Sequence, residues 1–147
     1  MPNRNKQKGT RFEYEWLYYL LYHHFSNIRS YASIGVADIR SVPPRFAKLN
    51  ICLASQCKNT KKGDYIDPAE RGRLGRFSKK YSYIVCEPFK LNRTCYVKLQ
   101  PWNLKGKIMT PEMFLNIYYG ISADPWKIAR KNYDSGVRRK IDCVRLP

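Results

Sequence analysis

Four polar residues in the first half of the chain have types and spacing that could support chemistry: Glu13, Asp38, Gln56 and Lys58. Gln56 and Lys58 are two residues apart in a segment of alternating polarity, so a strand would direct both side chains to one side of a sheet. A carboxylate and a second oxygen ligand hold a hard divalent cation beside a phosphate, where the cation stabilises developing charge and helps to form hydroxide. A lysine ammonium beside that cation orients or activates the water. The set predicts metal-dependent hydrolysis of a phosphodiester.

Each of these residues also has an ordinary structural interpretation. Asp38 could support a turn, Lys58 could be a solvated strand end, and Glu13 could face a basic neighbour. By the three-to-four spacing of a helix, Glu13 shares one face with Leu17, Leu20 and Leu21. Charged residues usually turn away from an apolar face, so this carboxylate is unusual. The joint order of an acid, then an acid or amide, then x-Lys favours the hydrolytic interpretation.

The charge balance indicates a polyanionic partner. The 147 residues include 28 Lys+Arg and 11 Asp+Glu, a formal net charge of +17. Such a surplus repels itself unless a polyanion such as nucleic acid neutralises it. An anionic membrane surface is the alternative partner, but no run approaches the ~20 apolar residues of a spanning helix. The basic, polar start (1–9) is not a secretory signal, and we find no RNP-type or KH signature of an RNA-binding domain.

The cysteines and histidines are expected to be structural. The five cysteines are odd in number and none is spaced as CxxC, so we interpret them as small buried hydrophobes in a reducing, intracellular (cytoplasmic) compartment rather than as metal ligands. His23 and His24 are adjacent in a predicted helix. Neighbours in a helix do not share a face, so a two-histidine metal site is not expected.

Several elements must position the four polar residues. We expect a flexible basic arm over 1–9, a helix over 10–26, short strands over 28–33 and 36–41, an alternating strand over 48–58 and a polar loop over 59–66. A strand pair over 82–89 and 94–100 completes a core spanning 10–100. Helices over 110–119 and from Asp124 onward form a basic, helical extension (101–147) of the same domain. The pattern predicts an α/β fold with a mixed central sheet flanked by helices.

A second helix is predicted to begin after Asp67, which suits the N-cap position. Pro68 suits the first helical position, and Glu70 follows three residues after the cap as a capping partner. The helix carries a row of cations that, in a chain of this charge, we expect to contact phosphates. The predicted nucleic-acid contacts, including two lysines of the preceding loop, are Lys61, Lys62, Arg71, Arg73, Arg76, Lys79 and Lys80.

Four sequence segments resemble, in their order and spacing, the archaeal Holliday junction resolvases (Hjc) of the PD-(D/E)xK superfamily. The stretches are KGTRFEYEWLYYLL, YASIGVADI, LASQCKNTKKGDYI and ERGRLGRFSKKY. The matching positions are Lys8-Gly9, Arg11-Phe12-Glu13, Ser33 with Gly35, Asp38, Lys58, and the basic helix around Arg73 and Phe77. The resemblance covers about residues 8–100. Small nucleases of archaeal viruses are alternative relatives.

The resemblance implies a restriction-endonuclease-like fold and a homodimer that cuts DNA, including branched DNA, with Mg²⁺ or with Mn²⁺ as a substitute. It implies metal ligation by Asp38, Gln56 and the Cys57 backbone carbonyl. Lys58 would attend the water, Ser33 would contact the phosphate, and Glu13 would bind a second metal or a metal-bound water. Gln56 departs from the glutamate of the resolvases, although the site also resembles that of the transposon end-cutting subunit TnsA, which uses QxK. The alternative is a DNA-binding relative with a decayed catalytic site.

Overall fold

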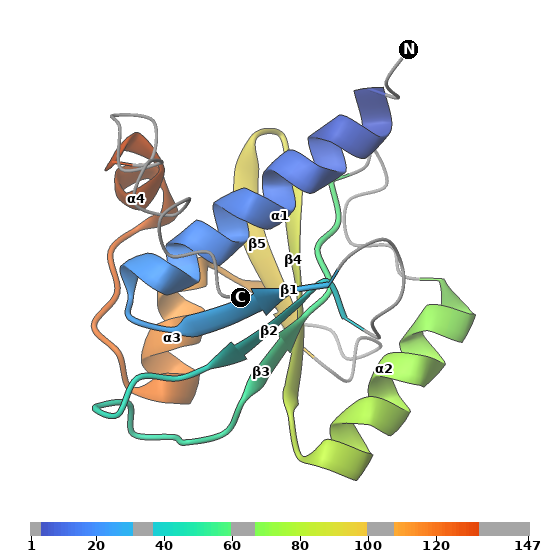
Figure 1. Cartoon of the computed structure of the whole chain (residues 1–147). Coiled ribbons are helices and arrows are strands. Elements are labelled where there is room, and N and C mark those ends of the chain that lie inside the picture. The colour runs from blue at the N-terminus through green and yellow to red at the C-terminus, as the bar shows by residue number, and fades with distance from the viewer. Residues whose placement is uncertain (1–3, 31–36, 60–66, 100–107, 133–147) are drawn as a thin grey trace.

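The computed structural model describes residues 4–30, 37–59, 67–99 and 108–132 (Figure 1). Six strands form one sheet in the order β1-β2-β3-β4-β5-β6. β3 and β4 pair parallel and the other neighbouring pairs are antiparallel. The strands are β1 (Ser26–Arg29), β2 (Ile39–Val42), β3 (Leu53–Ser55), β4 (Ile84–Leu91), β5 (Thr94–Leu99) and β6 (Ile108–Met109). The predicted mixed sheet is confirmed.

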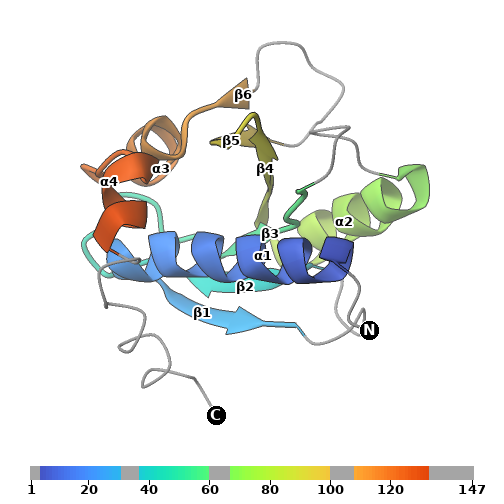
Figure 2. The ribbon, with the colours of Figure 1, turned by 90° about the horizontal axis from the view of Figure 1, so that it is seen from above.

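Four helices flank the sheet: α1 (Arg4–Tyr22), α2 (Pro68–Tyr81), α3 (Pro111–Tyr119) and α4 (Trp126–Asn132). α1 runs across one face, and α3 and α4 lie toward its C-terminal end, away from α2 (Figures 1 and 2). α2 lies in the connection from β3 to the parallel β4, because parallel strands need a crossover between them. Within the described residues, no helix is long and apolar enough to cross a membrane.

Residues of β3 and β4 alternate between two apolar clusters. Leu53 and Cys86 belong to the large cluster under α1, whereas Ala54 and Val85 pack with Leu74 of α2 on the other face. The alternation follows from the two-residue period of a strand. The sheet therefore carries α1 on one face and α2 on the other, and residues near the end of β3 lie between the two helices.

The first helix differs from the prediction at both ends and in its buried face. It begins at Arg4, so most of the expected arm is helical, and it ends at Tyr22. Its buried stripe is formed by Phe12, Trp16, Tyr19 and Leu20, and Glu13 lies at the margin of that stripe rather than in its centre. Aromatic side chains bury more area than leucines, so they determine which face turns inward. The Trp16 indole N–H donates to Ser55 Oγ at 2.9 Å, which fixes α1 over β3.

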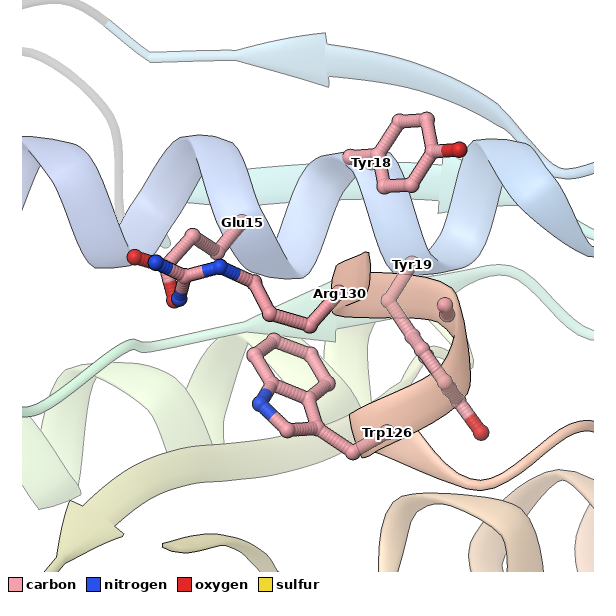
Figure 3. Close-up of a pocket in the computed structure, with 6 residues that line it drawn as sticks. Glu15, Tyr18, Tyr19, Trp126 and Arg130 are labelled. Atoms are coloured by element: carbon pink, nitrogen blue, oxygen red, sulfur yellow. The ribbon is translucent and has the colours of Figure 1, made fainter. Parts of the chain in front are cut away.

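A buried carboxylate ties α1 to two distant segments. Glu15 forms ion pairs with Lys90 Nζ at 2.7 Å and with Arg130 Nη1 at 2.5 Å, although its side chain is only 1% exposed. Figure 3 shows Arg130 of α4 reaching toward Glu15 beside Trp126. A buried charge is tolerated only when cations compensate it. The cluster therefore holds α4 and the end of β4 against α1.

His23 is structural, as expected. Its ring is buried; Nε2 accepts from the Asp124 backbone N–H at 3.0 Å, and Nδ1 lies 2.8 Å from the Tyr19 carbonyl oxygen. This pattern requires a proton on Nδ1 and none on Nε2. Burial, the largest cause, lowers the pKa of His23 and favours this neutral form. The described cysteines, Cys52, Cys57, Cys86 and Cys95, are free thiols.

Helix α2 begins where the sequence predicted, directly after Asp67. Asp67 is its N-cap and accepts from the Ala69 backbone N–H at 2.8 Å, and Pro68 occupies the first turn. Leu74 is the buried residue of this helix, packed with Ala54 and Val85. The cations Arg71, Arg73, Arg76, Lys79 and Lys80 are all exposed. One leucine therefore carries much of the apolar contact that docks a highly charged helix.

We predict that Leu74→Ala lowers the free energy of unfolding by about 2–4 kcal/mol, because it removes a fully buried side chain and leaves a cavity between α2 and the sheet. Equilibrium urea unfolding monitored by circular dichroism measures the change. The neighbouring exposed Arg73→Ala is the control and should stay within about 0.5 kcal/mol of the wild type. Equal stability of Leu74→Ala and Arg73→Ala would contradict this docking.

Candidate active site

Asp38 lies directly before β2, and its carboxylate is bound to the chain that follows β3. Asp38 Oδ2 accepts a hydrogen bond from the Cys57 backbone N–H at 2.9 Å. The parallel ladder continues past Ser55, because the N–H groups of Gln56 and Lys58 donate to Cys86 and Pro88 at 3.0 and 2.9 Å. The ladder gives this segment a fixed extended course. Asp38 is thereby held against the QxK segment through the Cys57 N–H.

Lys58 projects toward α2. Its Nζ lies 2.9 Å from Glu70 Oε2, and the two side chains are 21% and 18% exposed. The pairing places Glu70 in the site and corrects the prediction that Glu70 serves as the capping partner of Asp67. A carboxylate in the first turn is close enough to the sheet to reach a strand residue, and an ammonium is a stronger partner for it than a backbone N–H.

Glu13 faces a basic neighbour, which was one of the two interpretations of this residue. Arg29 of β1 donates to Glu13 Oε2 from Nε at 2.9 Å and from Nη2 at 2.7 Å. The Arg29 guanidinium also lies over the Tyr14 ring, 4.8 Å from its centroid. α1 and β1 are therefore joined at the carboxylate that the sequence assigned to the site.

The surroundings of Asp38 oppose the ionisation of its carboxyl group. Burial, reinforced by the negative charge of Glu13, raises its pKa from 3.8 to about 7. The Cys57 hydrogen bond and Lys58 act in the opposite direction, and Glu70 adds a smaller raising effect. Burial also raises the pKa of the Cys57 thiol, so Cys57 offers the site its backbone rather than a thiolate. Glu13, Asp38 and Glu70 thus come from three elements and act on one another.

The oxygen donors fit a hard divalent cation. Among the described residues, no three Asp, Glu, His or Cys side chains form a metal-binding cluster. Mg²⁺ does not need one, because it usually keeps several waters and takes one or two carboxylates. Asp38 supplies a buried carboxylate whose ionisation is opposed by burial and by Glu13, and a divalent cation would relieve that opposition. Gln56 and the Cys57 carbonyl carry neutral oxygens in the segment whose Cys57 N–H binds Asp38.

The strand register gives a physical reason for glutamine at position 56. Ser55 lies opposite Cys86 and Lys58 opposite Phe89, so Gln56 lies opposite Glu87 on the neighbouring strand. Glu87 is fully buried. A glutamate at position 56 would place a second carboxylate beside this buried one, and like charges opposite each other destabilise a sheet.

Several predicted contacts lie outside the described residues, namely Ser33, Lys61 and Lys62. The predicted residues that the structure brings together are Asp38, Cys57 and Lys58, with Gln56 directly before Cys57 in the same extended segment. Glu70 is the site residue that the sequence did not reveal. Two features of the sequence could have indicated it. Gln56 lacks the negative charge of a glutamate, and Glu70 is an acidic residue in the next predicted helix.

Comparison with known proteins supports the fold. No protein-family model and no curated protein sequence matches the chain. Among solved structures, the chain is similar to Hjc, a Holliday junction resolvase from the archaeal hyperthermophile Archaeoglobus fulgidus, with a TM-score of 0.55 and 25% sequence identity. The match covers 69% of this chain and 81% of that protein. The chain therefore has the restriction-endonuclease-like fold of this resolvase.

The raised pKa of Asp38 gives a pH prediction for the metal-free protein. A carboxyl with a folded-state pKa of about 7 and an ordinary value of 3.8 destabilises the fold as pH rises between these values, because the unfolded chain ionises first. Asp38→Asn keeps an acceptor for the Cys57 N–H but cannot ionise. In chelator, its melting temperature should differ least from that of the wild type below about pH 3.8 and should exceed it increasingly as pH rises to about 7.

The exposed cap residue Asp67 provides the control for this measurement. Asn is also a good N-cap, so Asp67→Asn should show no such trend with pH. A melting-temperature difference for Asp38→Asn that stays constant with pH would contradict the electrostatic description of the site.

Proposed function

We propose that the protein is a Mg²⁺-dependent DNA endonuclease of the structure-specific, Holliday junction resolvase type. The observation that carries the proposal is the attachment of Asp38 to the Cys57 N–H, one residue from both Gln56 and Lys58, in a fold similar to an archaeal resolvase. Acid, amide and ammonium side chains are the groups that hydrolysis of a phosphodiester requires around a hard cation.

Each site residue has a role in this mechanism. Asp38, Gln56 and the Cys57 carbonyl would hold Mg²⁺, with Mn²⁺ as a substitute. Glu13 of α1 would bind a second metal or a metal-bound water. The ion supplies neutralisation of the charge that develops on the phosphate. Lys58 orients the attacking water and stabilises the charge near it. Glu70 is a positioning residue, since its carboxylate fixes the Lys58 ammonium at 2.9 Å.

The basic surface would bind the substrate. The exposed cations of α2 follow Glu70 directly, so phosphates bound along that helix would lead toward the site. We propose Ser33, Lys61 and Lys62 as further contacts with DNA. Resolution of a junction needs two symmetric cuts, for which a homodimer is the expected form.

A catalytically decayed DNA-binding relative is the second candidate. Gln56 favours it, because the substitution removes a negative charge where the resolvases carry glutamate. Both candidates share the basic surface, and they differ in whether DNA is cut.

The decisive experiment incubates the protein with a four-way junction and a matched duplex, each with Mg²⁺ and with chelator. We expect metal-dependent cutting that Asp38→Ala or Lys58→Ala abolishes. DNA binding should persist in both variants, because most of the affinity comes from basic side chains elsewhere. Glu112→Ala removes a carboxylate from α3 and should cut like the wild type. Wild-type cutting by Asp38→Ala would refute the assignment of the site.

Gln56→Glu separates the two candidate functions. Without metal the new carboxylate opposes Glu87 and lies near Asp38, so the variant should melt below the wild type. Mg²⁺ should restore its stability, because a ligand that binds only the folded state stabilises that state. Melting and cleavage are measured as functions of Mg²⁺ concentration.

The results distinguish three cases. Cutting by both forms, with a lower Mg²⁺ requirement for Gln56→Glu, supports a working QxK site. Cutting by Gln56→Glu alone identifies a decayed nuclease. If neither form cuts and neither is stabilised by Mg²⁺, the metal site does not exist.

A further inference from the structure

The β4–β5 hairpin ends in a turn whose backbone favours glycine, yet arginine occupies it. Leu91 pairs with Thr94, so Asn92 and Arg93 form a two-residue turn. Both turn residues have positive φ, 51° and 65°. A two-residue turn with two positive φ values is of type I′, for which Asn-Gly is the preferred sequence. Asparagine suits its position, but a side chain on the second residue crowds the backbone. Arg93 is therefore present at a cost to the fold.

Within the described part of the chain, the fold gains no compensating bond from Arg93. The residue is exposed and makes no hydrogen bond or ion pair with any described residue. Leu91, at the base of the same turn, is 46% exposed. A glycine would complete the turn with less strain. The strain that Arg93 places on the turn is therefore not offset by a contact of its side chain with the described residues.

The hairpin lies beside the candidate active site. Lys58 pairs in parallel with Phe89, and the Lys90 N–H donates to the Lys58 carbonyl at 3.1 Å. From Phe89 to the turn is three residues, or about 10 Å at the rise of a strand. Figure 1 shows the hairpin tip extending past the sheet beside α1. The tip thus extends beyond Lys58 in the same direction along the sheet.

The base of the hairpin is held rigidly. Lys90 forms its ion pair with the buried Glu15 at 2.7 Å and lies over the Phe12 ring, 5.3 Å from the centroid. The tip consequently presents its side chains at a fixed position relative to α1 and Lys58. A fixed cation placed beside a phosphodiester site is a device for holding a neighbouring phosphate.

We propose that the β4–β5 hairpin tip is a DNA-contacting element in which Arg93 binds a backbone phosphate a few nucleotides from the one held at Lys58. The proposal rests on the proposed function, because that function places a phosphodiester at Lys58. A guanidinium is suited to phosphate, which it can bind through two parallel hydrogen bonds. The separation of about 10 Å corresponds to about three nucleotides at the ~3.4 Å rise of one strand of duplex DNA.

Substitutions at position 93 separate the two effects of the arginine. Arg93→Gly removes the cation and relieves the backbone, so its melting temperature should rise by about 2–4 °C while DNA affinity falls about three- to tenfold. Arg93→Ala should lose the same affinity without the gain in melting temperature. Arg93→Lys should keep most of the affinity and the wild-type melting temperature.

Binding is measured by fluorescence anisotropy with a labelled duplex and a four-way junction in chelator, across a range of salt concentrations. The salt slope of Arg93→Ala should fall by about one unit, as expected for one lost phosphate contact. Arg45→Ala is the matched control. It also removes an exposed arginine, but from the loop that follows β2, at the end of that strand remote from Asp38.

The outcomes are distinguishable. Loss of affinity and salt slope in Arg93→Ala, with Arg45→Ala unchanged, supports the proposal. Equal losses in the two variants would indicate a general effect of charge and overturn it. Unchanged binding by Arg93→Ala while the wild type binds DNA overturns this proposal alone. Failure of the wild type to bind any DNA overturns the proposed function as well.

Discussion

The hydrogen bond from the Cys57 N–H to the Asp38 carboxylate is the contact on which the site depends. It joins the residue before β2 to the segment after β3, and that segment stays extended because its own N–H groups bond to β4. Without the parallel ladder, Gln56 and Lys58 would have no fixed position relative to Asp38. The sheet topology therefore assembles the candidate site: Asp38 directly precedes the antiparallel partner β2, and the parallel partner β4 holds the QxK segment.

Negative charge is scarce in this chain, and much of it is placed inside. The sequence has 11 acidic residues against 28 basic ones. Glu15 and Glu87 are buried, and Glu13, Asp38 and Glu70 are partly shielded from solvent around the site. Each carboxylate that leaves water needs a cation or a donor. Arg29, Lys58 and Lys90 supply cations to Glu13, Glu70 and Glu15. Ion pairs of this kind connect α1, α2, α4, β1 and β4, so the charges that shape the site also join the elements.

The sequence predicted those features that depend on local chemistry. The cap at Asp67 with Pro68, the helix over 110–119, and the mixed sheet were all recognisable from neighbouring residues. The start of α1 was not recognisable. Acidic residues in the first turn mark many helix starts, and none follows Asn3 or Arg4 there. The buried face of α1 was also wrong, since aromatic residues outweighed leucines. The Lys58–Glu70 pair joins residues whose proximity only the β3–α2–β4 crossover creates, and a local pattern cannot reveal it.

The relation among Gln56, Glu70 and Glu87 explains how a QxK segment can be compatible with this fold. The register places position 56 beside the fully buried Glu87, where a further carboxylate would be repelled. Glutamine keeps an oxygen donor at that point without adding charge. A carboxylate is available instead from α2, where Glu70 is partly exposed and compensated by Lys58. The charge that the strand cannot accommodate thus lies on the helix facing it, a short distance from Asp38, whose pKa it also raises.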